Sequence, residues 1–132
     1  TSYTFAAGGV ELRINFSSVA LALDEDLAEA SRPITHVHIE AVAADGREHP
    51  VAVYIDQIAD AAVADEREVV TLRRQRSETL EVMSAGTLAQ RWLFERNDRI
   101  AWGYMLVAAP RAAPGLHTAM GNATYLRGAF LN

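Results

Sequence analysis

Hydrophobic and polar residues alternate with a period of two along residues 10–17. The apolar members of this segment are Val10, Leu12, Ile14 and Phe16, and the residues between them are polar. Successive side chains of a strand point to opposite faces of a sheet. The pattern therefore predicts a strand with one buried face and one solvated face.

The same period recurs at residues 32–44. It places Thr35, Val37, Ile39 and Ala41 on one face and His36, His38 and Glu40 on the other. Asp45-Gly46 follows and is typical of a tight turn that needs positive φ angles. The apolar alternation then resumes at 50–56. Together these segments predict an antiparallel hairpin at the middle of the chain.

A third apolar segment covers residues 99–109. Its alternation separates Ile100, Trp102, Tyr104 and Leu106 from Ala101, Gly103, Met105 and Val107. A strand with water on one side has one polar face, and here both faces are apolar. We expect the strand either to lie between two sheets or to receive another domain on its second face. The second face, Ala101, Gly103, Met105 and Val107, is our predicted domain interface.

Further strands are predicted at 68–74 and 79–83, and a helix of at most two turns at 23–30. Residues 57–65 are assigned to strand or loop. Alternation weakens over 117–131, although the last residues, 129–131, resemble a strand. About seven strands with at most one or two short helices predict an all-β antiparallel β-sandwich. We expect one domain over residues 1–132, excised from a larger multidomain protein.

Composition narrows the classes of partner and compartment. The chain has 132 residues, a net charge of −5 and no cysteine. The negative charge disfavours nucleic-acid backbones, and the absence of cysteine removes disulfides and thiolate sites. Its apolar runs are too short to cross a membrane, which takes about 20 residues. All 12 basic residues are arginine, which indicates a bacterial genome rich in GC.

One face of the predicted central strand carries three potential metal ligands, His36, His38 and Glu40. Neutral imidazoles and a carboxylate suit zinc or a similar ion. Three ligands in a single strand row converge poorly, because alternate residues lie roughly 7 Å apart. The favoured interpretation is a solvated strand face, and the alternative is a small metal-dependent hydrolase. His49 and His117 are the remaining histidines that such a site would recruit.

Aromatic residues supply a second candidate site. Trp92, Trp102 and Tyr104, with Tyr125, offer rings on which a sugar can stack. Tryptophan and tyrosine at inward strand positions more commonly belong to the core. A carbohydrate-binding module requires at least two of these rings to lie coplanar on an exposed surface, and this requirement separates the two interpretations.

Several short motifs occur in a characteristic order along nearly the whole chain. They are Tyr3-Thr4-Phe5 with Ala7-Gly8-Gly9-Val10, Asp24-Glu25-Asp26-Leu27, Ser31-Arg32-Pro33-Ile34-Thr35, Asp45-Gly46-Arg47-Glu48-His49, Val53-Tyr54-Ile55-Asp56 and Trp102-Gly103-Tyr104. In order and spacing the set resembles the N-terminal β-sandwich domain of the glutaminase A-like proteins, a domain of unknown function. The chain departs from that pattern at Ala101, where an aspartate is usual. It also departs at His36 and His38, where other residue types are more common.

The resemblance implies an accessory role. In that family the domain precedes a helical-barrel region similar to six-hairpin glycosidases, and the full enzymes are secreted or periplasmic hydrolases associated with ammonia release from glutamine. The expected partner is therefore the helical barrel of the same parent chain. We assign no catalytic residue, metal or cofactor to these 132 residues. The departure at Ala101 argues against a function of the usual aspartate in this chain, and the departure at His36 and His38 argues against a metal site shared by the family at these histidines.

Overall fold

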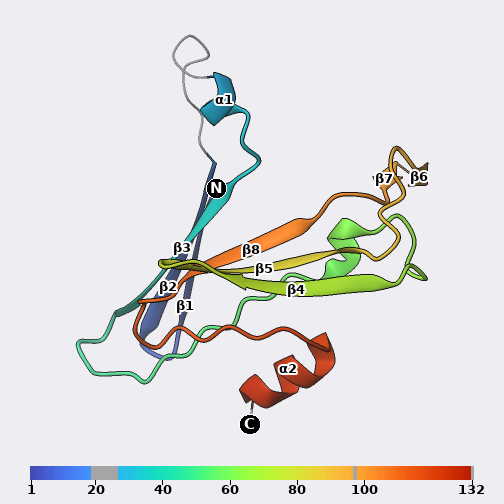
Figure 1. The fold of residues 1–132 in the computed structure, drawn as a ribbon. Helices are drawn as coiled ribbons and strands as arrows, with labels where there is room; N and C mark the ends of the chain where they lie inside the picture. The colour runs from blue at the N-terminus through green and yellow to red at the C-terminus, as the bar shows by residue number, and fades with distance from the viewer. Residues whose placement is uncertain (19–26, 97, 132) are drawn as a thin grey trace. The chain divides into compact units, whose positions relative to one another are not determined.

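The computed structural model describes residues 1–18, 27–96 and 98–131. The described chain is mostly strand, arranged in three antiparallel sheets with one longer helix near the C terminus (Figure 1). The predicted all-β, sandwich-like class is confirmed. The residues form two compact units, Thr1–Val53 and Tyr54–Asn132.

The first unit contains a three-stranded sheet with the order β1-β2-β3. The strands are β1 (Ser2–Ala7), β2 (Val10–Ser18) and β3 (Thr35–Ala43), and a short helix, α1 (Leu27–Ala30), precedes β3. Residues 23–26 of the predicted helix lie outside the described residues. Gly8 and Gly9 form the turn between β1 and β2 with φ angles of 58° and 82°. Glycine suits this turn because it lacks the Cβ that disfavours positive φ.

The register of this sheet separates an apolar face from a polar face. Ile14 pairs with Tyr3 on one side and with Ile39 on the other, so directly opposed residues share a face. The apolar face consists of Tyr3, Phe5, Ala7, Val10, Leu12, Ile14, Phe16, Val37, Ile39, Ala41 and Ala43. The alternation predicted for residues 10–17 and 35–43 is therefore confirmed as an apolar and a polar face. The predicted burial of the apolar face is wrong for the described residues, because every residue of β3 is exposed and β2 is at most half-buried.

The predicted central hairpin is wrong. Residues 50–56 form no strand, and β3 pairs with β2 instead. Gly46 does take a positive φ of 74°, but the Asp45 carboxylate accepts from the backbone N–H of Arg47 and bonds the His49 ring. These local bonds shape an irregular loop, and Pro50 has no N–H to give to a ladder.

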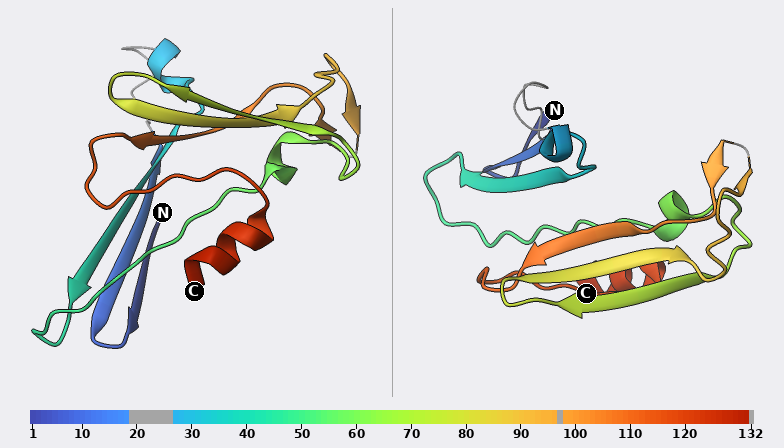
Figure 2. Two further views of the ribbon diagram at one scale, coloured as in Figure 1. Left: turned by 60° about the horizontal axis from the view of Figure 1, so that its bottom comes forward. Right: turned by 45° about the horizontal axis from the view of Figure 1, so that its top comes forward.

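The second unit holds the other two sheets. Its three-stranded sheet has the order β4-β5-β8, with β4 (Val70–Arg76), β5 (Leu80–Thr87) and β8 (Met105–Pro110). A two-stranded sheet pairs β6 (Glu95–Arg96) with β7 (Arg99–Ile100). A 3-10 turn, η1 (Ala59–Ala62), and the helix α2 (Ala123–Leu131) complete the unit. Figure 2 shows α2 on one side of the three-stranded sheet.

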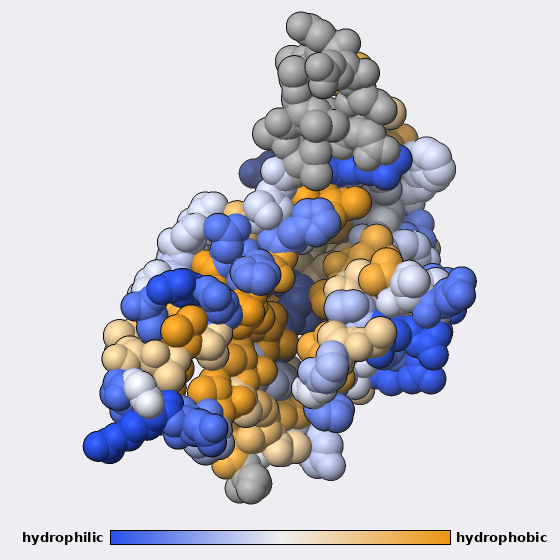
Figure 3. Space-filling view, turned by 90° about the vertical axis from the view of Figure 1, so that its left-hand side faces the viewer, coloured by the Kyte–Doolittle hydropathy of each residue, from blue (hydrophilic) through white to orange (hydrophobic). Residues whose placement is uncertain are grey.

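The buried residues of the described chain are small and gather in the second unit. The buried apolar residues are Ala62, Val63, Ala64, Ala85 and Ala101. Many larger apolar side chains reach the surface, as the orange residues in Figure 3 show. The described chain therefore keeps much of its large apolar side-chain area in contact with water.

Three further predictions for the second unit differ from the structure. The strand expected at 99–109 is interrupted after Ile100 and resumes at Met105. Residues 59–62 form a helical turn where strand or loop was expected, and 123–131 form a helix. Asn122 begins that helix, because its Oδ1 accepts from the Tyr125 N–H at 3.0 Å. An N-cap asparagine before Ala123 was the signal that the alternation argument overlooked.

Candidate functional site

A buried hydroxyl at the end of β5 organises the loops of the second unit. Thr87 is 2% exposed and is the one buried polar side chain among the described residues. Its Oγ1 donates to the Ala101 carbonyl at 2.6 Å and accepts from the Gln90 backbone N–H at 3.1 Å. A buried hydroxyl satisfied in both roles stabilises the groups it joins. Thr87 therefore ties β5, the following turn and residue 101 together.

The Gln90 side chain extends this network to residue 103. Its Nε2 donates to the Thr87 carbonyl at 2.9 Å and to the Gly103 carbonyl at 3.1 Å. Its Oε1 accepts from the Gly103 N–H at 2.8 Å. Gly103 has a φ of 87°, which favours glycine. The amide thus fixes the backbone of Gly103 and accounts for the break in the expected strand.

Two tryptophans lie beside the residues of this network and face each other. Trp92 is two residues after Gln90, and Trp102 directly precedes Gly103. Their ring centroids are 6.2 Å apart and their planes differ by 13°. Trp92 is 79% exposed and Trp102 36%. The hydrogen bonds between Gln90 and Gly103 fix the backbone beside this exposed indole pair. The rings are stacked on each other, which differs from the coplanar arrangement required above for a two-ring carbohydrate-binding surface.

The cation next to the indole pair is already neutralised. The Arg91 guanidinium bonds the Glu68 carboxylate and lies 3.7 Å from the centroid of the Phe94 ring. The same carboxylate accepts from the Ala64 N–H at 2.9 Å. The hydrogen bond from Arg91 is the main reason that the pKa of Glu68 lies below its ordinary value. Arg91, the residue before Trp92, is therefore already paired with a carboxylate.

Tyr104, the third predicted aromatic residue, has different neighbours. Its ring lies 6.0 Å from the Arg73 guanidinium, measured to the ring centroid. A Cβ added to Gly86 would lie 2.6 Å from the Tyr104 Cδ1, so the ring covers that glycine closely. Tyr104 is 47% exposed. We therefore assign Tyr104 to the surface of the sheet, beside Arg73.

The four predicted interface residues have unequal environments. Ala101 is fully buried and Gly103 is bound by Gln90, whereas Met105 and Val107 lie on β8. Met105 pairs with Ala85 and Val107 with Met83, so these two share one face of the sheet. Val107 is 37% exposed. The interface remains a prediction, and Met105 and Val107 are its accessible members.

His36, His38 and Glu40 lie on the polar face of the first sheet. Their cross-strand partners are Ser17, Asn15 and Arg13. Arg13 Nη1 donates to Glu40 at 3.2 Å. Among the residues that the structure describes, no cluster of three or more histidine, aspartate or glutamate side chains is able to hold a metal ion. The structure does not assemble these three, His49 or His117 into a ligand set.

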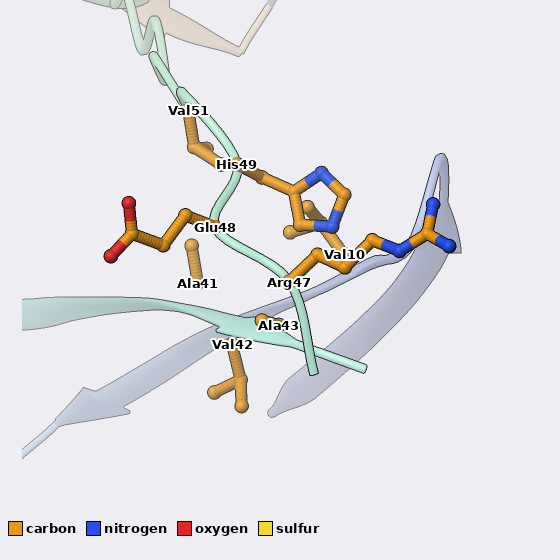
Figure 4. A pocket seen from close by; sticks show the side chains of 8 residues that line it. All are labelled: Val10, Ala41, Val42, Ala43, Arg47, Glu48, His49 and Val51. Carbon is orange, nitrogen blue, oxygen red and sulfur yellow. The ribbon is translucent and has the colours of Figure 1, made fainter. Parts of the chain in front are cut away.

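A shallow hollow of about 400 Å³ lies in the first unit, between the ends of β2 and β3 and the loop after β3 (Figure 4). His49 Nε2 lies 2.8 Å from Asp45 Oδ1. This hydrogen bond is the largest contribution that lowers the pKa of Asp45. Gly9 lies next to this carboxylate, since a Cβ added to Gly9 would be 2.5 Å from Asp45 Oδ2. The pair fastens its loop to the Gly8-Gly9 turn.

A second hollow, in the second unit, is lined by charged residues that neutralise one another. Arg99 binds both oxygens of Asp60, at 3.3 and 3.0 Å, and Arg96 binds Asp65 at 2.7 Å. Arg99 lowers the pKa of Asp60 through its hydrogen bonds. These ion pairs connect η1 and the segment after it to β6 and β7. Sequence reasoning did not find them, because the partners are 39 and 31 residues apart.

The three antiparallel sheets of the described residues define an all-β, sandwich-like fold class. The chain belongs to the family described as Domain of unknown function (DUF5127), which it matches over residues 1–132. No curated protein and no solved structure is detectably similar to it. No helix of the described residues is long and apolar enough to cross a membrane.

Proposed function

We propose that this chain is an accessory, non-catalytic β-sandwich domain of a glutaminase A-like multidomain hydrolase. Its role is to pack against a helical-barrel catalytic region of the same parent chain. The ordered motifs from Tyr3 to Tyr104 support this parentage, and the match to a family of unknown function is compatible with it.

The observation that carries the proposal is the exposed apolar surface. Tyr3, Phe5 and Ile39, all on the apolar face of the first sheet, are 51%, 54% and 38% exposed. In the second unit, Val107 on β8 is 37% exposed. Apolar side chains gathered on one side of a sheet mark a surface that another layer of protein covers. A domain that contributes such a surface to a larger protein fits an accessory role.

The charged groups also support a role without chemistry of its own. Asp60, Asp65 and Glu68 each bind an arginine. Each of these carboxyls has a pKa below its ordinary value, so it stays ionised and engaged at neutral pH. A general acid or base needs a pKa near the working pH, which is the opposite shift.

Activity assays test the non-catalytic role directly. The chain should release no ammonia from glutamine, whereas the full parent protein should do so. Clear turnover by the 132-residue chain would contradict the accessory role. The coding sequence downstream should encode a helical region of several hundred residues, and its absence would remove the proposed partner.

The domain contact is tested in the full parent protein with two neighbouring substitutions. Val107→Arg changes the face of β8 that we assign to the helical barrel. Leu106→Arg is its matched control, because Leu106 is 64% exposed and points to the opposite face. We expect Val107→Arg alone to split thermal unfolding into separate transitions. Equal effects of the two changes would refute this interface.

The same resemblance leads us to propose a secreted or periplasmic bacterial protein. The support is the family likeness and the use of arginine for all 12 basic residues. Fractionation of the source cells, with the parent detected by antibody, tests the location. Recovery of the parent in the cytoplasmic fraction alone would contradict it.

A further inference from the structure

We propose that Trp92, stacked on Trp102, forms a platform whose free indole face binds the apolar face of a neutral hexopyranose ring within an oligosaccharide. The proposal is independent of the glutaminase parentage. It depends on the geometry of the pair, on the network that holds it and on the charge around it.

The geometry leaves an indole face free for a ligand. The two rings are within 13° of parallel, and Trp92 is 79% exposed. Burial of an indole is strongly favourable, so a tryptophan left in water has an unused capacity for contact. Pyranose rings present flat patches of C–H groups, and these patches stack on an aromatic face. Because the two indoles are stacked on each other, the free face of Trp92 is the surface that a sugar ring can cover.

The pair is held in place before any ligand arrives. Gln90 makes hydrogen bonds in both directions with the backbone of Gly103, and buried Thr87 anchors Gln90 and Ala101. These bonds fix the backbone on both sides of the pair. Side chains already positioned lose less entropy on binding.

The charge around the pair selects a neutral ligand. Arg91 is engaged by Glu68 and by the Phe94 ring, and the chain carries a net charge of −5. Nucleic acids and anionic lipids would meet repulsion and find no available cation at Arg91. Proline-rich peptides also bind aromatic surfaces, but they dock in grooves between rings. Neither of the two hollows described above is lined by Trp92 or Trp102, and an exposed indole face suits a sugar ring better than a peptide that needs a groove.

The test is a titration of the 132-residue chain with four named oligosaccharides. The probes are cellohexaose, xylohexaose, mannohexaose and maltohexaose, with a proline decapeptide as the competing class. Binding is followed by tryptophan fluorescence and by the indole N–H signals in NMR spectra. We expect at least one hexasaccharide to saturate the signal with a Kd of about 1 mM or tighter, a range in which one stacked ring contributes measurably.

Substitutions distinguish binding at the tryptophan platform from non-specific binding to other exposed aromatic residues. Trp92→Ala should weaken binding about tenfold or more, whereas Trp92→Phe should retain part of it. Tyr125→Ala is the matched control, because Tyr125 is 74% exposed on α2 and outside the pair. Gln90→Ala tests positioning, since it should weaken binding while circular dichroism shows an intact fold.

Three results would overturn the proposal. The first is no saturable binding of any hexasaccharide at about ten times a Kd of 1 mM. The second is equal loss of binding in Trp92→Ala and Tyr125→Ala. The third is binding of the proline decapeptide alone, which would assign the pair to a peptide partner.

Discussion

Each of the two units of the chain is stabilised internally by a different kind of interaction. In Thr1–Val53 the sheet follows strict alternation, and Val10, Leu12 and Ile14 of β2 each oppose residues of the same face on β1 and β3. In Tyr54–Asn132 the loops depend on particular polar side chains, such as Thr87, Gln90 and the arginines that bind Asp60 and Asp65.

We expect the two kinds of structure to differ in how many amino-acid substitutions they tolerate. A sheet built on alternation accepts any residue of suitable polarity, because a shift of register by one residue would exchange its apolar and polar faces. A loop built on one buried hydroxyl and one amide accepts few changes, because an unsatisfied buried group costs roughly 1–3 kcal/mol. The exposed tryptophan pair depends on the second kind of structure.

The largest expected effect is in the second unit. Gly86→Ala should destabilise the chain by about 2–3 kcal/mol, because the new methyl group overpacks a filled space. Its Cβ would lie 2.6 Å from Tyr104 Cδ1 and 2.7 Å from the Gly103 carbonyl oxygen. Gly128→Ala, in α2 with nothing within 4 Å of an added Cβ, should stabilise by about 0.5–1 kcal/mol. Urea denaturation measures both, and the same sign for the two changes would contradict the account.

The next effect compares two neighbouring glycines in the first unit. Gly8→Ala should cost about 1 kcal/mol, because its φ of 58° disfavours alanine but its surroundings are open. Gly9→Ala should cost about 2 kcal/mol, since its Cβ would also displace Asp45 and break the bond to His49. Denaturation gives both values, and NMR of the His49 ring reports the broken bond. Equal costs would show that the loop is not fastened there.

A smaller contrast tests the alternation itself. Ile14→Ala removes apolar contacts with Tyr3 and Ile39 and should cost about 1–2 kcal/mol at this half-buried position. Asn15→Ala, on the polar face, loses only an exposed hydrogen bond to Ser2 and should stay within about 0.5 kcal/mol. The measurement is the free energy of unfolding of each variant. A reversed order would place the covered face on the polar side.

The smallest effect is a dependence on pH. Asp56, Asp60 and Glu68 have lowered pKa values because arginines donate hydrogen bonds to them. A lowered pKa in the folded chain contributes stability above the ordinary value, which is 3.8 for aspartate and 4.5 for glutamate. That contribution is lost as the pH falls through the lowered values.

We therefore expect the thermal midpoint to be constant from neutral pH to about pH 5 and then to fall. The fall should be shallow because all three ion pairs are partly exposed and are screened by salt. Thermal scans at several pH values and two salt concentrations measure it. A midpoint that rises on acidification would contradict these pairings.

The sequence predicted the features that depend on alternation. The β2 and β3 faces, the solvated position of His36 and His38 and the all-β class follow from a period of two. The family likeness predicted a domain of unknown function, and the family match agrees. Each of these predictions depends on many residues together, so it does not depend on any single contact.

The features that the sequence missed depend on single contacts. The strand break at Gly103 needs the Gln90 amide, 13 residues away, and no periodic pattern encodes that contact. The absent hairpin depends on the bonds that Asp45 makes within its own loop. Trp92 and Trp102 were found as candidates by residue type alone, whereas their parallel arrangement required the structure.

The most direct test of the account is whether Gln90 holds the two indoles together in solution. Nuclear Overhauser effects between the Trp92 and Trp102 rings should be present in the wild-type chain and lost in Gln90→Ala, while the signals of β1 and β2 stay unchanged. Contacts that are missing from the wild type, or that persist undiminished in the variant, would contradict the account.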